Sequence, residues 1–268
     1  HVAITGIHRT ILTLYGVTND KVYLNFCLNQ LDMINMEPEI VIGRRKLIEG
    51  HIYGYMAASL AKLELYRIDP DEKLLSPTMK ALHFMTSEDG MSISGGAGQE
   101  EIWTDDQDGR GELGESCATA YQLRVYDNLL RLNSDSRFGD IMERTLYNAL
   151  FGAQSPDGRQ IRYFTPLEGD RHYHNGDTYC CPCNYRRIIS ELPEMVYYHA
   201  VEGIAVNLYT SSTAEIALDG GRSVSIRQET DYPNSGHVVI HVNPSETASF
   251  PLKLRIPSWC GNARITVN

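Results

Sequence analysis

The chain has 268 residues, of which 42% are hydrophobic and 22% charged, a balance typical of a folded protein with a substantial core rather than a disordered one. Its 34 acidic and 24 basic residues leave a net charge of −10, and the absence of a Lys/Arg run argues against nucleic acid as a partner. No apolar run reaches the roughly 18 residues of a membrane-spanning helix, so we expect no membrane partner.

The first part of the chain, residues 1–200, has the pattern of helices. Apolar residues recur at a spacing of about 3.6 around short polar turns, which predicts pairs of amphipathic helices. The two clearest helices span 51–68 and 117–132. Such antiparallel pairs stack into solenoids or close into toroids, and the spacing does not decide between them. The three predicted turns lie at residues 18–20, 69–71 and 133–135.

A glycine-rich stretch, residues 92–98, lies between the two clearest helices and leads into Glu100 and Glu101. A long irregular stretch of this kind often lines a functional cleft, although a solvated connection is the simpler interpretation. No phosphate-binding motif is complete here, because no βαβ pattern precedes the glycines and no Gly-Lys-Ser/Thr follows them.

From Gly203 the apolar period changes to two, which predicts strands separated by glycine- and asparagine-containing turns. The predicted strands are 204–209, 223–227, 238–242 and 252–256. They indicate a small antiparallel sheet or sandwich over 203–268. Because the last five residues again read as a strand, we expect the sandwich to be incomplete in this chain, and the missing initiator Met suggests a processed or fragmentary chain.

Four of the six cysteines fall in two short clusters, Glu115-Ser116-Cys117 and Cys180-Cys181-Pro182-Cys183. Adjacent cysteines rarely pair, and six cysteines in a chain of this length do not form a dense disulfide framework. Thiolates with one carboxylate are ligands that zinc accepts in a tetrahedral site. The spacing therefore favours a Cys3Glu metal site, with disulfides and reduced structural thiols as the alternatives.

Several stretches of the chain also resemble one known family, the β-L-arabinofuranosidases of glycoside hydrolase family 127 and their close relatives. They follow the family order across roughly residues 50–268, and the doubled cysteine followed by Pro and then Asn is the most specific. The stretches are Glu115–Ala118, Glu143–Ala149, Tyr163–Leu167, Cys180–Asn184, Val206–Tyr209 and Leu254–Trp259.

The resemblance implies an α/α toroid, a helix-pair barrel that would be incomplete here, followed by an antiparallel β-sandwich. The catalytic helical domain would be 1–200 and the sandwich 203–268. It further implies a zinc-dependent retaining glycoside hydrolase acting on β-L-arabinofuranosides or similar sugars. The expected partner is thus a carbohydrate substrate.

The resemblance also assigns roles to individual residues. The zinc ligands would be Glu115, Cys117, Cys180 and Cys181. Of these, Cys180 would be the nucleophile, which zinc would keep as a thiolate. The remaining assignments are Glu101 as general acid/base, with Glu100 as its alternative, and His51 and Tyr147 as substrate-binding residues.

A general acid must hold its proton in the free enzyme, so the resemblance calls for a raised pKa at Glu101. The acidic run Asp105, Asp106 and Asp108 is the candidate cause, unless these side chains face water. Two histidines, His172 and His174, form a weaker candidate metal pair.

Cys183 departs from the family pattern and opens other interpretations. The chief alternative function is a zinc-stabilised carbohydrate-binding or structural fragment without turnover. A thiol redox role for Cys180–Cys183 is the third, although the strand-to-helix setting of a thioredoxin-like motif is missing.

Overall fold

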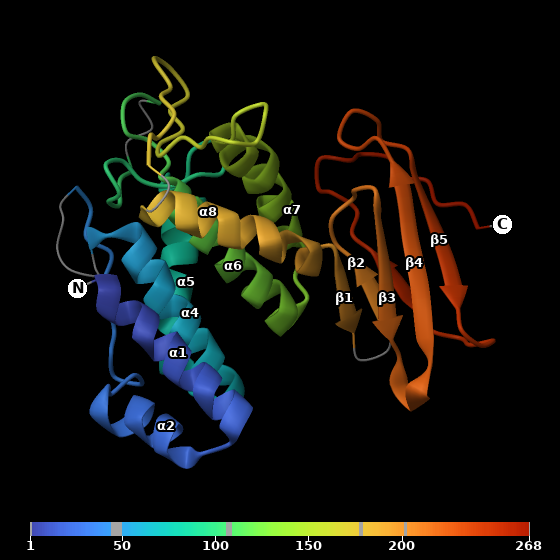
Figure 1. Ribbon diagram of the computed structural model, residues 1–268, viewed down its shortest axis with the longest axis horizontal. Helices are drawn as coiled ribbons and strands as arrows, with labels where there is room; N and C mark the ends of the chain where they lie inside the picture. Colours follow the sequence, from blue (N-terminus) through green and yellow to red (C-terminus); the bar gives the residue numbers. More distant parts are fainter. Residues whose placement is uncertain (1, 44–49, 106–108, 177–178, 201–202, 268) are drawn as a thin grey trace. The chain divides into compact units, whose positions relative to one another are not determined.

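The computed structural model describes residues 2–43, 50–105, 109–176, 179–200 and 203–267. They form two compact units, each with contributions from two parts of the chain (Figure 1). The first unit is His1–Leu129 with Arg144–Ile188, and the second is Leu130–Glu143 with Ile189–Asn268. A helical region thus precedes small β-sheets, as the periodicity predicts.

Most of the helices belong to the first unit, whereas α7 lies almost wholly in the second. Their bounds are α1 Val2–Thr18, α2 Lys21–Asn25, α4 Ile52–Ile68, α5 Glu72–Ser87, α6 Ser116–Asn133, α7 Ser136–Thr145 and α8 Cys180–Glu191. Two π-helical turns, Phe26–Gln30 and Leu146–Leu150, follow α2 and α7 directly. Among the described residues, no helix is both long and apolar enough to cross a membrane.

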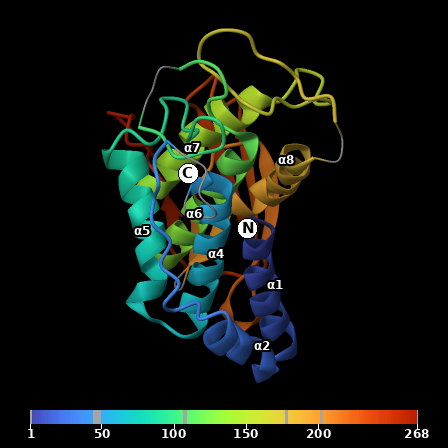
Figure 2. The ribbon, with the colours of Figure 1, turned by 90° about the vertical axis from the view of Figure 1, so that its left-hand side faces the viewer.

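The three predicted helix–turn–helix pairs are confirmed. Asp20 caps α2 by accepting the Val22 N–H at 3.0 Å, and Asp71 caps α5 by accepting the Lys73 N–H at 2.8 Å. Helix α1 lies beside α4, and α4 beside α5 (Figure 2). Buried side chains from α1, the π-turn after α2, the turn that follows it, α4 and α5 share one cluster, formed by Leu12, Cys27, Met33, Ala61, Leu65 and Leu74.

The stretch between α5 and α6 is irregular yet packed. Trp103 is fully buried, with Tyr55 and Phe84 edge-on to its ring at centroid distances of 5.3 and 5.6 Å. Gly98 has a φ of +84°, and a Cβ there would lie 2.7 Å from the Ile102 carbonyl oxygen, so only glycine fits. Residues 95–98 are buried, which excludes a solvated connection for that part of the stretch.

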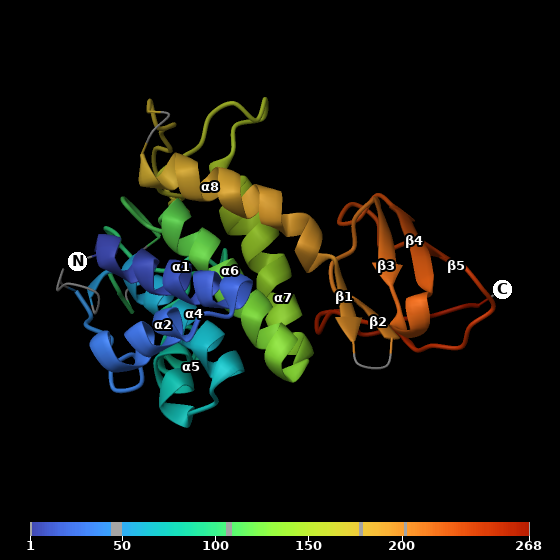
Figure 3. The same ribbon diagram turned by 60° about the horizontal axis from the view of Figure 1, so that its bottom comes forward.

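The second unit contains two three-stranded sheets, with the order β1-β2-β6 in one and β3-β4-β5 in the other. Strands β1 to β5 are labelled in Figure 3. The strand bounds are β1 Tyr197–Ala200, β2 Gly203–Val206, β3 Ser212–Ala217, β4 Ser223–Thr230, β5 Val238–Pro244 and β6 Leu252–Leu254. Ile204 of one sheet and Val224 and Ile226 of the other belong to one buried cluster. The two sheets therefore share a core.

The strand predictions need four corrections. Strands begin at Tyr197, before the predicted change of period, and β3 was not predicted, because its alternation is carried by small and polar residues. Strand β6 pairs with β2 in parallel rather than antiparallel, since the chain returns to the first sheet only after completing the second. Residues 264–267 form no strand.

A buried arginine organises the polar interior of the second unit. Arg255 lies against Asp140 Oδ1 at 2.6 Å, pairs with Glu143 and donates to the Asn207 carbonyl oxygen at 2.7 Å. The Trp259 indole N–H donates to the other oxygen of Glu143 at 3.2 Å. These bonds satisfy charges that would otherwise be costly to bury.

Candidate metal centre and catalytic residues

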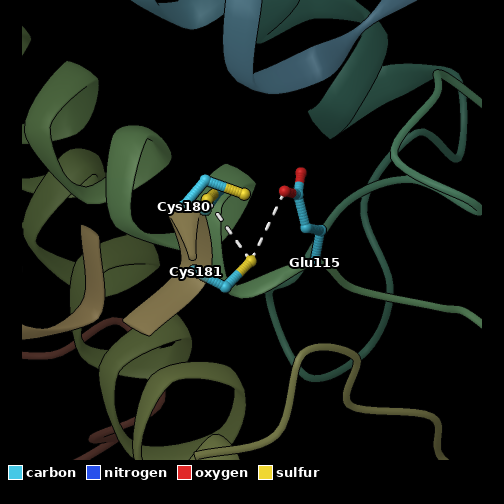
Figure 4. A group of neighbouring side chains, drawn as sticks. Glu115, Cys180 and Cys181 are labelled. Carbon is cyan, nitrogen blue, oxygen red and sulfur yellow. Dashed lines mark hydrogen bonds between the residues drawn. The ribbon is translucent and has the colours of Figure 1, made fainter. Parts of the chain in front are cut away.

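The two cysteine clusters converge at the beginnings of two helices. Glu115 directly precedes α6 and Cys117 lies in its first turn, while Cys180 and Cys181 open α8. Their four ligand atoms all lie within 4.8 Å of one another. Three of the four side chains are buried and Cys180 is half-buried. Figure 4 shows the Glu115 carboxylate turned toward the adjacent cysteines of α8.

The sulfur and carboxylate atoms of this cluster are close enough together to bind one metal ion. The Cys181 thiol lies 3.3 Å from Cys117 Sγ and 3.5 Å from Glu115 Oε1, while Glu115 Oε2 is buried with no hydrogen-bond partner among the described residues. A tetrahedral zinc site with bonds of ~2.3 Å places its sulfur ligands about 3.8 Å apart. The four residues therefore fit a metal ion of this kind, and the cluster could hold one.

Burial and mutual hydrogen bonding shift the acidities within the cluster. Burial raises the pKa of Glu115 to about 7. A hydrogen bond with Cys180 raises the pKa of Cys117, and burial raises that of Cys181. Hydrogen bonds from Cys117 and from Cys181 hold the pKa of the Cys180 thiol well below its usual range. Cys180 is thus the thiol that ionises first.

Of the two adjacent glutamates, Glu101 faces this cluster. Its Oε1 accepts a hydrogen bond from the Tyr163 hydroxyl, and its Oε2 lies 3.5 Å from His51 Nε2. Its side chain is 17% exposed, whereas Glu100 is an exposed residue whose backbone N–H donates to the Glu112 carbonyl oxygen. The geometry thus favours Glu101 over Glu100.

The acidic residues after Glu101 do not show whether they raise the pKa of its carboxyl. Asp105 is exposed, and Asp106 and Asp108 lie outside the described residues. The raised pKa expected at Glu101 therefore stays a prediction.

Tyr163 connects the two proposed catalytic side chains, and its role was missed from the sequence. Besides donating to Glu101, its hydroxyl lies 3.5 Å from Cys180 Sγ. Tyr163 belongs to one of the stretches that resemble the family, so the sequence marked this residue without indicating its contacts. Nothing in a single tyrosine 17 residues before Cys180 indicates that the two side chains meet.

His51 combines a structural role with a position in the site. Its Nδ1 accepts the backbone N–H of Gly54 at 3.4 Å and so caps α4. With Nδ1 as the acceptor, the neutral ring carries its proton on Nε2, which faces Glu101. The substrate-binding role predicted for His51 stays a prediction.

The other residues singled out from the sequence lie outside the ligand cluster. Tyr147 lies in the π-turn after α7 with its ring edge-on to Phe151, and its substrate-binding role stays a prediction. His172 is exposed, and the His174 ring packs against Tyr163 at 5.8 Å. Neither histidine belongs to the cluster of possible metal ligands found among the described residues.

Cys183 is half-buried on α8 and is likewise outside that cluster. All six cysteines are unpaired, which contradicts the disulfide alternative.

Comparisons with known proteins show which family the chain resembles. The sequence profile of the β-L-arabinofuranosidase GH127 catalytic domain matches residues 3–194, and that of the GH127 middle domain matches residues 203–268. A non-reducing end β-L-arabinofuranosidase of Bifidobacterium longum subsp. longum is 30% identical over 175 residues, which is 58% of this chain and 26% of that protein.

Solved structures of the family are also similar. A GH127 β-L-arabinofuranosidase from Geobacillus stearothermophilus T6 has a TM-score of 0.78 and 27% identity, covering 96% of this chain and 47% of that one. A second GH127 β-arabinofuranosidase has the same TM-score at 26% identity, covering 94% and 42%. The chain therefore spans about half the length of these structures or less. Two profile matches that together cover most of its residues show that it belongs to the GH127 β-L-arabinofuranosidase family.

Proposed function

We propose that this chain carries the active site of a retaining glycoside hydrolase that acts on β-L-arabinofuranosides or similar sugars. One observation carries the proposal: the Tyr163 hydroxyl is within hydrogen-bond distance of both Glu101 and Cys180. The carboxylate and the thiol are therefore at most about 6 Å apart, close to the ~5–5.5 Å between the two catalytic groups of retaining enzymes. An inverting enzyme needs a wider gap to admit water.

The proposed metal is zinc, held by Glu115, Cys117, Cys180 and Cys181. The donor set of three thiols and one carboxylate supports it, since soft thiolate ligands in a tetrahedral arrangement favour zinc. When bound, zinc would keep these thiols in the thiolate form.

The chemistry of the chain's own residues follows from their positions. Cys180, the one half-buried ligand, would attack the anomeric carbon while Glu101 donates its proton to the departing oxygen. Glu101 would then take a proton from the water that releases the sugar from Cys180. Tyr163 would hold the carboxyl of Glu101 in line with that sulfur.

Two finer features of the fold belong to the same proposal. The helix pairs would form part of an α/α toroid, and the two sheets a β-sandwich, over domains 1–200 and 203–268. The antiparallel helix pairs and the core shared by the two sheets support this. Limited proteolysis with mass spectrometry would test where the boundary between the two domains lies.

The test combines metal analysis with hydrolysis of an aryl β-L-arabinofuranoside. We expect about one zinc per chain and turnover with retained anomeric configuration by NMR. Cys180→Ser and Glu101→Gln should each lower kcat by at least 100-fold. Cys183→Ser, a matched thiol variant outside the ligand cluster, should remain active.

Inversion of configuration, or full activity of Cys180→Ser, would contradict the mechanism. Zinc binding with no turnover would favour the alternative function, a zinc-stabilised carbohydrate-binding or structural fragment. That alternative is supported by the four possible ligands, since a zinc ion with four protein ligands is usually structural.

A further inference from the structure

Asn184 makes a buried contact with the ligand cluster that the proposed mechanism does not use. It lies on α8, is 2% exposed, and its Nδ2 donates to Cys117 Sγ at 3.1 Å. Cys117 is itself fully buried. The amide N–H of Asn184 therefore contacts a sulfur atom that is not accessible to water.

Two neighbours set the orientation of this amide. Arg187 Nη1 donates to Asn184 Oδ1 at 3.3 Å, which assigns the oxygen to the arginine side and leaves the NH2 group facing Cys117. Tyr53, in the first turn of α4, also hydrogen-bonds with the Asn184 side chain. The amide is thus held from α4 and α8, while the sulfur it contacts belongs to α6.

This contact matters because the site would carry a net negative charge with a divalent ion bound. Three thiolates and one carboxylate around a divalent ion carry a net charge of −2, and three of these four side chains are buried. The N-terminal ends of α6 and α8 both lie at the site, and each offers about half a positive charge. Roughly one negative charge remains, so hydrogen-bond donors to the sulfur atoms are needed to stabilise the thiolates.

We propose that Asn184 is a positioning residue of this metal centre: its N–H stabilises the Cys117 thiolate and directs that sulfur toward the ion. The inference rests on the proposed metal site but not on turnover. Asn184 acts through Cys117 and does not touch the substrate. Its partner Arg187 keeps the N–H, rather than the amide oxygen, against the sulfur.

The experiment measures metal binding to the full chain with zinc and with cobalt. Asn184→Asp keeps the shape of the side chain but replaces the donor with a charged acceptor, and Asn184→Ala removes the donor without adding charge. Asn148→Asp, an exposed amide on the π-turn after α7, is the matched control. Zinc affinity is measured by chelator competition, and the thiolate-to-cobalt charge-transfer band by absorption.

We expect Asn184→Ala to lose 10- to 100-fold in zinc affinity, Asn184→Asp to lose more, and the control to be unchanged. The cobalt band should move to lower energy in Asn184→Ala, because a thiolate that has lost a hydrogen bond is more electron-rich. A merely structural role would lower the thermal stability of the metal-free chain and leave the cobalt band in place.

Two results would overturn the inference. Zinc affinity within about twofold of wild type together with an unshifted cobalt band in both Asn184 variants would refute the role of the amide. A wild-type chain that takes up neither zinc nor cobalt would refute the metal centre and this inference together. Metal uptake with the expected variant effects but without hydrolysis would refute only the proposed function.

Discussion

Glu115 is expected to destabilise the metal-free chain, and replacing it with Gln should therefore stabilise that chain while abolishing metal binding. The residue is almost fully buried, Oε2 has no hydrogen-bond partner among the described residues, and burial raises its pKa from 4.5 to about 7. At about 1.4 kcal/mol for each pKa unit, ionising this carboxyl in the folded chain costs about 3 kcal/mol.

The sign of the pH dependence follows from which state binds the proton. Below pH 4.5 the carboxyl is protonated in both the folded and the unfolded chain. Between 4.5 and about 7 only the folded chain keeps the proton, so its contribution to the free energy of unfolding falls as the pH rises. Above about 7 the full cost is present. Glu115→Gln has no such contribution.

The assay is urea unfolding of metal-free protein at pH 5 and pH 8, with the chain's two tryptophans used as separate reporters. In a Trp259→Phe background the remaining Trp103, which is fully buried, reports on the first unit. The stability advantage of Glu115→Gln should grow by about 2–3 kcal/mol between the two pH values. Glu112→Gln, an exposed neighbour, is the control and should show no growth.

An advantage of Glu115→Gln that is equal at both pH values would refute this reasoning. It would mean that the carboxyl is already ionised at pH 5 or is still solvated in the folded chain. Loss of zinc from Glu115→Gln without any stabilisation of the metal-free form would likewise show that the site does not impose the cost.

Three further predictions concern the scaffold. Arg255→Met should destabilise the second unit by about 3–5 kcal/mol, because the Glu143 carboxylate would remain buried without its cationic partner. Trp259 fluorescence in urea checks this, and a change below about 1 kcal/mol would contradict it. Trp103→Ala should cost about 3–5 kcal/mol in thermal or urea unfolding, whereas Trp103→Phe should cost less, since it keeps an aromatic ring and removes an indole N–H without a described partner; equal losses would contradict this. Lys62→Met should cost about 2–4 kcal/mol by urea unfolding, because the buried Nζ donates to three backbone carbonyls; a more stable variant would show that relief of the buried charge outweighs those bonds.

The sequence alone was sufficient for the helix pairs and for the cluster of possible metal ligands. The helix pairs around residues 18–20, 69–71 and 133–135 follow from a 3.6-residue apolar period interrupted by Asp and Asn, which is local information. The four side chains that could hold a metal ion were predictable for a similar reason. Few roles other than metal binding explain adjacent cysteines together with a Glu-x-Cys pair, and the identities of the side chains determine which ion they suit.

Short-range patterns were less reliable for the strands. Strand β3 alternates small and polar residues and therefore gives little hydrophobic signal, and the parallel pairing of β6 with β2 depends on the path of the chain through a second sheet. Neither the existence of β3 nor the pairing of β6 can be predicted from a window of about ten residues, because tertiary contacts determine which strands pair.

Only the tertiary structure decided which side chains meet in the site. Glu100 and Glu101 are identical neighbours, both with positive φ, yet only the side chain of Glu101 turns toward His51 and Tyr163. Tyr163 and Asn184 are ordinary polar residues in the sequence. Their contacts with Glu101, Cys180 and Cys117 arise because segments distant in the chain pack together, and the distances that follow from packing are not properties of any one segment.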